Sequence, residues 1–357
     1  MKEPQVVLDD TSPHGNLQAI VEQDERVAYL YVRALQREDL GTRSCWLRNL
    51  APAPEELDRD GMEEGIPPML PREHCLHPEG MAPLDATRLE IVWFPEGDGI
   101  ALLEDGKPLA VIPSWGITGD FPGYARDARG ESMLGWGLSG AEAIPERVRA
   151  AITWWRNGSP WKECQDAFLA EYERVLGPRS RYFAIDGQRW PNKAMVRTDT
   201  KEGSYLLTLG ISLRPQPQVE LHYEDPADLR RFEFAACLVP GTDEQTIMQL
   251  ARYLSGQSNL PWENLTFLGN GHTVPCDAFS EDPGLRHFTA VLLVDHPPGA
   301  PEINPLRMDG DRVMLLWVVP ITEAERQLIV EERSAEFIER FPADWPLHVI
   351  AKRPVVL

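Results

Sequence analysis

The sequence predicts an α+β protein in which helices pack on a mostly antiparallel sheet, preceded by a smaller β-rich domain. Early in the chain, short branched and aromatic runs alternate with turn formers, as is typical of strands. Later segments mix such runs with longer amphipathic stretches that begin at capping residues. A chain of 357 residues is also longer than one core usually supports. We therefore expect two domains, over residues 1–145 and 146–357.

In the first domain we expect strands at Val27–Arg33 and Ser44–Leu47, where aromatic and branched residues lie between turn formers. Residues 51–71 are rich in proline and in carboxylates. Because like charges and prolines do not pack a core, this stretch is predicted to be an exposed loop. A hairpin signal spans Arg88–Ile112, and its Asp105-Gly106 pair suits a type I′ turn, whose central residues both need a positive φ.

The Ser114–Gly140 stretch combines many glycines with aromatic residues. We interpret it as an irregular loop that its aromatics pin to a small core, and a ligand-gripping loop is the alternative. Helices are predicted at Glu146–Trp155 and Trp161–Leu176. The second begins with Ser159 as its N-cap and ends at Gly177-Pro178.

Two further helices carry the signature of a capping box, in which two side chains each bond the other's backbone N–H. One pairs Thr242 with Gln245 and ends at Gly256, and the other pairs Thr322 with Glu325. The remaining segments read as strands, at Arg181–Ile185, Met195–Thr198, Tyr205–Ser212, Val219–His222, Phe232–Leu238, Leu265–Leu268, Phe288–Val294, Val313–Val319 and near His348–Ala351.

The composition narrows the choice of partner and compartment. A formal charge of −21 and a pI near 4.8 disfavour nucleic acid and favour a basic protein, unless the charge serves only solubility. Five scattered cysteines predict free thiols in a reducing compartment. The first ten residues lack the apolar core of a signal peptide, and the apolar run Val313–Ile321 is too short to span a bilayer. We expect a cytoplasmic protein without a membrane segment.

Catalytic chemistry and metal binding each have one weak candidate in the sequence. His272 and Cys276 could form a thiolate–imidazolium pair for a hydrolase or thiol enzyme. We favour the interpretation in which the His272 ring nitrogens hydrogen-bond the loop backbone and Cys276 packs as a small apolar side chain. His74, Cys75 and His77 lack the second ligand pair that a zinc site needs. No phosphate-cradling pattern is present, so we expect no cofactor.

Glu233 stands between Phe232 and Phe234 in a predicted strand. Alternation places its side chain opposite to both aromatic rings, on the outer face or in a cleft. An outer, solvated glutamate is the favoured reading.

Five short motifs, in order, resemble the Suppressor of fused (Sufu) domain, over roughly Ala150–Leu357. They are Tyr205–Ser212, Arg231–Phe234, Ile247–Leu254, Gly271–Pro275 and Val319–Glu325. The arrangement resembles the bacterial branch of that family. Leu206 departs from the animal pattern, which has a tyrosine there, so binding of the animal peptide is not carried over.

The resemblance implies a non-enzymatic, regulatory protein that binds a protein or peptide by strand addition or in a cleft between domains. In the bacterial branch it implies an immunity protein that neutralises a toxin. The partner-binding residues that we predict are Leu209, Gly210, Ser212 and Glu233, together with the loop residues Gly271, His272, Thr273 and Pro275. Pro320, Thr322 and Glu325 are interpreted as fold determinants, because they begin a helix.

Overall fold

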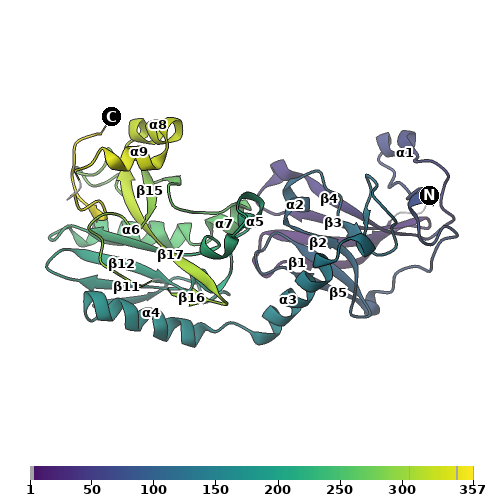
Figure 1. Cartoon of the computed structure of the whole chain (residues 1–357), viewed down its shortest axis with the longest axis horizontal. Coiled ribbons are helices and arrows are strands. Elements are labelled where there is room, and N and C mark those ends of the chain that lie inside the picture. Colours follow the sequence, from purple (N-terminus) through teal and green to yellow (C-terminus); the bar gives the residue numbers. More distant parts are fainter. Residues whose placement is uncertain (1–3, 305, 343–344, 357) are drawn as a thin grey trace. The chain divides into compact units, whose positions relative to one another are not determined.

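The computed structural model describes residues 4–304, 306–342 and 345–356, so the first three residues of the amino-terminal stretch considered above lie outside it. The chain divides into two compact units (Figure 1). The first comprises Met1–Gly158 with Trp262–Leu265, and the second comprises Ser159–Pro261 with Thr266–Leu357. The division therefore falls at Gly158 and not at residue 145.

The first unit contains two sheets. One is a four-stranded antiparallel meander, in the order β1 (Gln5–Thr11), β2 (Leu17–Gln23), β3 (Val27–Ala34) and β4 (Thr42–Asn49). The other has five strands, in the order β5 (Leu89–Trp93), β6 (Ile100–Glu104), β7 (Lys107–Ile112), β8 (Tyr124–Ala125) and β9 (Trp136–Gly137). Asp105 and Gly106, between β6 and β7, both have positive φ, as the predicted turn requires.

The main core of the first unit combines residues of both sheets. Leu17, Leu30 and Trp46 of the four-stranded sheet share it with Ile100 and Leu109 of the five-stranded sheet. A second cluster covers the other face of the five-stranded sheet, where helix α3 (Ala143–Asn157) packs Ile144, Val148 and Ala151 against β5 and β6. Because its apolar face is buried there, α3 belongs to the first unit, which moves the boundary beyond the predicted one.

The two long loops of the first unit differ in character. Residues 51–71 are largely irregular, with one short helix, α1 (Arg59–Glu63), capped by Asp58. Their carboxylates are exposed, but Ala53 and Leu70 are buried in the main core, so the prediction of a stretch that packs no core is wrong in part. The glycine-rich stretch contains α2 (Ser114–Thr118), β8 and β9. Its aromatic rings pack on one another: the ring of Phe121 lies 4.9 Å from the rings of both Tyr124 and Trp136.

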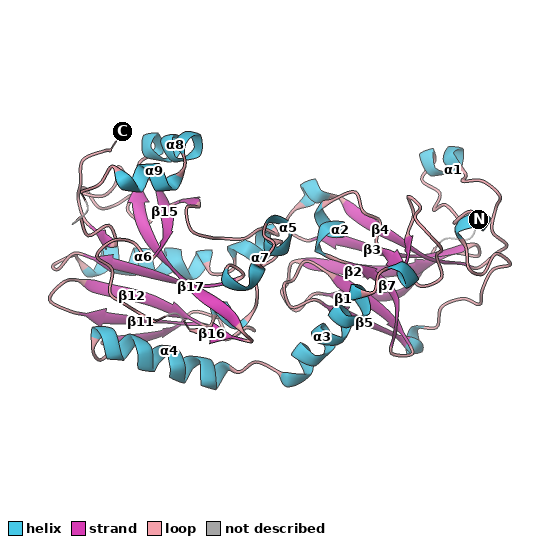
Figure 2. Cartoon of the chain, viewed as in Figure 1, coloured by secondary structure: helices cyan, strands magenta, loops and turns pink. Residues whose placement is uncertain are grey.

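The second unit is built on one nine-stranded sheet (Figure 2). Its main path is β10 (Arg181–Ala184), β11 (Ala194–Asp199), β12 (Ser204–Leu209), β13 (Arg231–Leu238), β17 (Asp311–Ile321), β15 (Ala290–Asp295) and β14 (Thr273–Pro275). Two short strands complete it: β16 (Arg307–Met308) pairs with β17, and β18 (Val349–Ile350) pairs with β13. Pairing is antiparallel except where β13 meets β17 and β18. The predicted α+β class with a mostly antiparallel sheet is confirmed.

Helices pack on this sheet. Cys164, Phe168 and Tyr172 of α4 (Trp161–Leu176) join a core with residues of β11, β12 and β13. All eight residues of β13 are buried, so both faces of the sheet are covered at that strand. Near the end of the chain, α8 (Glu323–Glu332) and α9 (Ser334–Glu339) lie beside β15 and β17 (Figure 1). No helix in the described residues is both long and apolar enough to cross a membrane.

Several predicted boundaries are wrong. The N-cap of α4 is Pro160, not Ser159, and no side chain caps it. Helix α6 (Glu244–Gln257) begins after Asp243, whose carboxylate accepts a hydrogen bond from the Thr246 N–H, so Thr242 is not its cap. Gly256 lies inside α6 instead of ending it.

Two predicted strands are absent from the described chain. Val219–His222 forms the short helix α5, after Gln218 in the left-handed conformation. Leu265–Leu268 is irregular and follows α7 (Leu260–Asn264). By contrast, the capping box of Thr322 and Glu325 is present as predicted, although Arg333, with a φ of 99°, splits the expected helix into α8 and α9.

Candidate functional site

The first group of predicted partner-binding residues lies where β12 ends. Gly210 has a φ of 96° in the left-handed region, and a Cβ atom there would lie 2.4 Å from the Asn192 carbonyl oxygen. Both the torsion and the close approach require glycine. The chain then turns through a short 3₁₀ helix (Ile211–Leu213), which carries Ser212 inward. Leu209, Gly210 and Ser212 are all buried.

Glu233, on β13, joins this turn as a hydrogen-bond acceptor. Its Oε1 accepts from the Gly210 N–H (2.7 Å), the Ser212 N–H (3.0 Å) and the Ser212 hydroxyl (2.7 Å). Its Oε2 accepts from the Thr208 hydroxyl at 2.8 Å. Glu233 is fully buried, so the reading of an outer, solvated glutamate is wrong. Thr208, Gly210, Ser212 and Glu233 are called the Glu233 cluster below.

Burial sets the protonation of this cluster. Loss of solvation raises the pKa of Glu233 to about 7, although the four hydrogen bonds from Ser212, Thr208 and Gly210 act to lower it. A cavity of about 20 Å³ lies beside the carboxyl group, against Phe168 and Tyr172 of α4. That volume accommodates about one water molecule. The cluster is therefore an internal brace between β12 and β13 whose charge changes near neutral pH.

A buried ion pair adjoins the cluster and was not predicted. Arg231 donates to Asp311 at 2.9 Å and to the Ser212 carbonyl at 2.8 Å, and both charged side chains are 3% exposed. Arg230 donates to the same carboxylate at 2.8 Å. One signal was available in the sequence: Arg231 and Glu233 are two residues apart on a strand and so share a face. Their partner Asp311 could not be found from local spacing.

The second predicted group lies elsewhere in the same sheet. Thr273 and Pro275 belong to β14, which is separated from β13 by β17 and β15. Three steps of about 4.8 Å separate β14 from β13 by roughly 14 Å. The register adds a shift along the sheet, because Glu233 pairs with Leu315 of β17 whereas Thr273 is level with Val319. The structure therefore does not bring the two predicted groups together. Gly271, His272 and Thr273 are half-buried and Pro275 is exposed, so this loop reaches the surface.

Strand β14 is the last in the sheet order, and little of its outer edge is open for pairing. The Leu293 N–H donates to the His272 carbonyl, and the Cys276 N–H donates to the Thr289 carbonyl. The backbone groups of residues 272, 274 and 276 therefore face β15. The outward-facing backbone then belongs to Thr273 and Pro275. Proline has no N–H, and its carbonyl already accepts a hydrogen bond from the Tyr253 hydroxyl at 3.0 Å. Proline on an edge strand disfavours further pairing.

His272 and Cys276 have different surroundings. The His272 ring lies 5.1 Å from that of Phe267, and burial lowers its pKa. The Cys276 thiol is buried beside Tyr253, and burial raises its pKa to about 12. A thiol with that pKa is protonated at neutral pH, and the thiolate is the nucleophilic form. The geometry favours the interpretation of Cys276 as a packed side chain. All five cysteines are free and buried.

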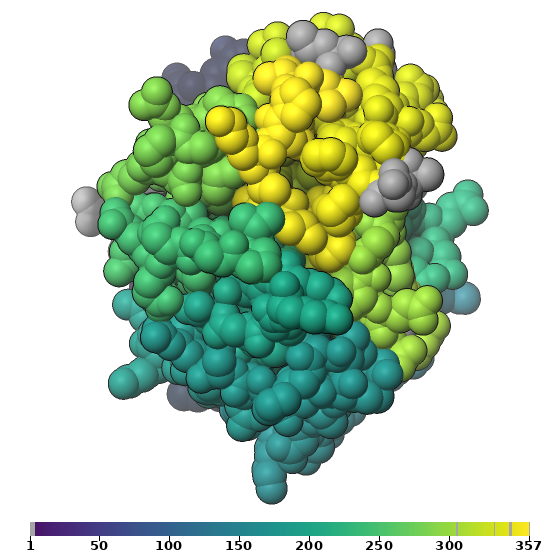
Figure 3. Space-filling model, turned by 90° about the vertical axis from the view of Figure 1, so that its left-hand side faces the viewer, coloured from purple at the N-terminus to yellow at the C-terminus, as the bar shows by residue number. Residues whose placement is uncertain are grey.

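Glu325 is a second buried acceptor. It accepts from the Thr322 N–H (2.8 Å), completes the capping box, and forms an ion pair with Arg353. Arg353 also donates to the Pro320 carbonyl at 2.7 Å and stacks over the ring of Phe288. Burial acts to raise the pKa of Glu325, but Arg353 and two backbone N–H groups outweigh it and lower the pKa. Figure 3 shows the carboxyl-terminal residues, in yellow, at the surface of the second unit.

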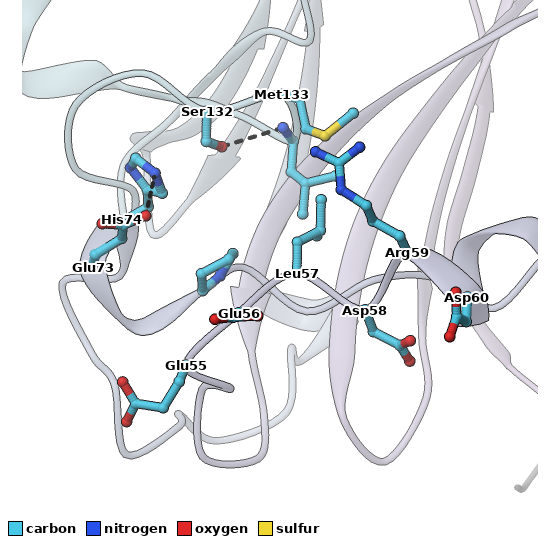
Figure 4. A pocket seen from close by; sticks show the side chains of 12 residues that line it. Glu55, Glu56, Leu57, Asp58, Arg59, Asp60, Glu73, His74, Ser132 and Met133 are labelled. Atoms are coloured by element: carbon cyan, nitrogen blue, oxygen red, sulfur yellow. Dashed lines mark hydrogen bonds and ion pairs between the residues drawn. The ribbon is translucent and has the colours of Figure 1, made fainter.

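The first unit has an acidic recess of about 620 Å³ (Figure 4). Its lining combines carboxylates with Arg59, His74 and a few apolar side chains; the carboxylates are those of Glu55, Glu56, Asp58, Asp60 and Glu73. The His74 ring hydrogen-bonds the Arg129 carbonyl. The buried Cys75 thiol accepts a hydrogen bond from the Asn49 amide instead. Within the described ranges, no group of three or more histidine, cysteine or carboxylate side chains is placed to hold a metal ion.

The comparisons concern the second unit. Residues 193–353 match the family model described as Suppressor of fused protein (SUFU). This stretch contains the Glu233 cluster, the 271–275 loop and the Glu325 capping box. It confirms the resemblance over those residues, whereas residues 150–192 lie outside the matched range. A comparison with curated protein sequences finds no match.

Two solved structures are similar to part of the chain. One is described as the Sufu-Fu complex crystal structure; it is 12% identical with a TM-score of 0.39, and the match covers 53% of this chain and 91% of that one. The other is Drosophila Suppressor of Fused, 10% identical with a TM-score of 0.37; the match covers 54% of this chain and 51% of that one. The chain thus spans about half of the Drosophila protein.

Proposed function

We propose that this protein acts by binding a protein or peptide partner, as a non-enzymatic regulator of the Suppressor of fused type. The observation that carries the proposal is the match of residues 193–353 to that family model. The surroundings of His272 and Cys276 support it, because a protonated, buried thiol is not available to attack a substrate. The alternative, a hydrolase or thiol enzyme, has no comparable support.

The partner in this proposal is a basic protein. The chain carries a formal charge of −21, and an acidic recess lies on its first unit. Such a field speeds the encounter with a cationic partner and repels nucleic acid. A basic toxin fits this description. We therefore place the chain in the bacterial branch, as a cytoplasmic immunity protein that binds a toxin and holds it inactive.

The contact surface in this proposal includes the loop Gly271–Pro275, which reaches the surface. The Glu233 cluster contributes from inside, because it fixes the turn after β12 and the spacing of β12 and β13. Leu209, Gly210 and Ser212 are buried, so their role is to shape the fold that presents the surface.

The test is affinity capture from the native cell with the full chain as bait, followed by titration of the purified partner. Thr273→Arg places a bulky cation in the loop, and Thr153→Arg, on the exposed side of α3, is the control with the same charge change. We expect capture of a basic protein and at least about a tenfold loss of affinity for the loop variant alone. Equal effects of the two variants would remove the loop from the proposal.

The immunity role is tested separately, by expressing the captured partner in cells with and without this chain. The proposal predicts that the partner arrests growth alone and that co-expression restores it. A partner that is harmless by itself would reject the immunity role while leaving protein binding in place. A captured protein that emerges cleaved or chemically modified would contradict the proposal as a whole.

A further inference from the structure

A groove of about 360 Å³ runs beside strand β5 in the first unit. Four consecutive residues of the strand, Glu90 to Trp93, line it along its length. Asp10 and Pro13 line one side, and Ile152, Trp155 and Arg156 of α3 line the other. The groove therefore follows the edge of a sheet, with β1 and its following loop on one side and a helix on the other.

Strand β5 is the first in its sheet order, so its only neighbour in the described sheet is β6. The register fixes which backbone groups face that neighbour. The Phe94 N–H donates to the Gly99 carbonyl and the Asp105 N–H donates to the Arg88 carbonyl, each at 2.9 Å. Antiparallel ladders alternate, so the even-numbered residues face β6. The N–H and C=O groups of Ile91 and the Trp93 N–H therefore point toward the groove, whereas the Leu89 N–H already donates to the Ala86 carbonyl.

A second outward group also has a partner. The Trp93 carbonyl accepts a hydrogen bond from the Trp155 indole N–H at 2.7 Å. This bond ties α3 to one end of the edge and leaves Ile91, with the Trp93 N–H, as the site for a new ladder. The N–H and C=O groups of one residue form a complete pairing unit for an added strand.

We propose that this groove binds an extended peptide segment of a partner protein, which adds to the five-stranded sheet as a strand beside β5. The walls favour a single strand, because α3 and Pro13 stand on either side of the edge and obstruct the approach of a second sheet. This site is independent of the Gly271–Pro275 loop. The residues that line it all lie between Asp10 and Arg156, outside residues 193–353, which match the family model.

The side-chain pattern of the peptide follows from the alternation of β5. Ile91 and Trp93 face the core shared by the two sheets, on the side where Asp10 accepts a hydrogen bond from the Trp93 indole at 2.8 Å. Val92 faces α3 and packs in the cluster that includes Ile152. A residue paired opposite Ile91 shares its face, so a lysine there approaches Asp10. Its neighbours in the peptide face Val92 and Ile152, where valine fits.

The experiment uses the full chain and a fluorescein-labelled peptide of nine residues that alternates lysine with valine. Ile91→Pro removes an outward N–H without breaking a bond to β6, and proline is tolerated at such edge positions. Tyr182→Pro is the matched control, because Tyr182 has its N–H on the outer edge of β10 in the other unit. We expect about a tenfold weaker binding for Ile91→Pro and less than about a twofold change for the control.

A second measurement needs no variant. In the wild-type chain, the saturating lysine–valine peptide should slow hydrogen exchange at the Ile91 amide by at least about tenfold. A peptide with glutamate in place of lysine should bind about tenfold more weakly, since its carboxylates meet Asp10. The proposal is overturned by an Ile91 amide that exchanges at the same rate with peptide, or by equal losses for both proline variants. A wild-type dimer that Ile91→Pro dissociates, with no peptide bound, would assign the edge to a second copy instead.

Discussion

The exchange of Glu233 for glutamine tests the Glu233 cluster most sharply. Glutamine has nearly the same shape, and its carbonyl oxygen can accept the hydrogen bonds from Gly210 and Ser212 that Oε1 accepts now. Its amide can donate to the Thr208 hydroxyl, which can itself turn toward the Phe234 carbonyl. The substitution therefore keeps the contacts and removes the titration.

The size of the effect follows from the pKa of Glu233, which burial raises from 4.5 to about 7. Between these two values the folded protein binds more protons than the unfolded chain, so stability falls as pH rises through that window. At about 1.4 kcal/mol for each pH unit, ionisation of Glu233 costs the folded state about 3 kcal/mol above pH 7. Below pH 4.5 the carboxyl is neutral in both states and this cost vanishes.

The assay is urea unfolding with pulse-labelled hydrogen exchange, read by mass spectrometry on peptides from β12 and β13. This readout isolates the second unit, which a whole-chain signal from two units does not. We expect Glu233→Gln to match the wild type at pH 4 and to exceed its free energy of unfolding by about 3 kcal/mol at pH 8. If the difference between the two proteins stays constant from pH 4 to pH 8, the buried carboxyl does not titrate as described.

Three further predictions concern single side chains. Asp243→Ala should lower the free energy of unfolding by about 1 kcal/mol, because it removes the N-cap of α6, and Thr242→Ala should lower it less. Urea unfolding of both variants checks this order. A larger loss for Thr242→Ala would contradict the observed start of the helix. Arg353→Met should lower the free energy of unfolding by about 3 kcal/mol, because it leaves the Glu325 carboxylate buried without its cation. Adding Glu325→Gln to this variant should restore part of the lost stability. A loss below about 1 kcal/mol for Arg353→Met in urea unfolding would refute the pairing. Cys276 should react with iodoacetamide at pH 8 much more slowly in the folded chain than in urea, and equal rates would show an accessible thiolate.

The two capping boxes show what local sequence can and cannot decide. The Thr322–Glu325 box forms as predicted, because both bonds lie within one turn and the preceding strand fixes the entry of the chain. Thr242 has the same spacing to Gln245, but Asp243 follows it and accepts the Thr246 N–H, while the Thr242 hydroxyl bonds back to the Val239 carbonyl. When two capping residues stand side by side, tertiary packing decides between them.

Glu233 was assigned to the wrong environment for a general reason. Alternation correctly placed its side chain opposite to Phe232 and Phe234, but the inference that the opposite face meets solvent fails when both faces of a sheet are covered. The core of α4 packs on the face of Glu233. Four donors then come from residues that are distant in sequence and become neighbours only when β12 pairs with β13. Periodicity gives a side-chain direction, not the depth of burial.

Strands that depend on pairing more than on composition were missed. Gln5–Thr11 forms β1 although it contains Asp9 and Asp10, which local propensity disfavours in strands. Its hydrogen bonds to β2 hold it at the sheet edge, where polar side chains meet solvent. The ion pair between Glu325 and Arg353 was missed for a related reason. It forms only when the chain folds, and no local sequence pattern connects residues that far apart.

We propose above that this chain binds another protein and leaves it chemically unchanged. Isothermal titration calorimetry of this chain with the captured partner tests that proposal most directly. Intact-mass spectrometry of the partner before and after mixing completes the test. A stoichiometric complex should form, weaken steeply between about 50 and 200 mM salt, and release the partner at its original mass. A partner whose mass changes in the presence of catalytic amounts of this chain would contradict the claim.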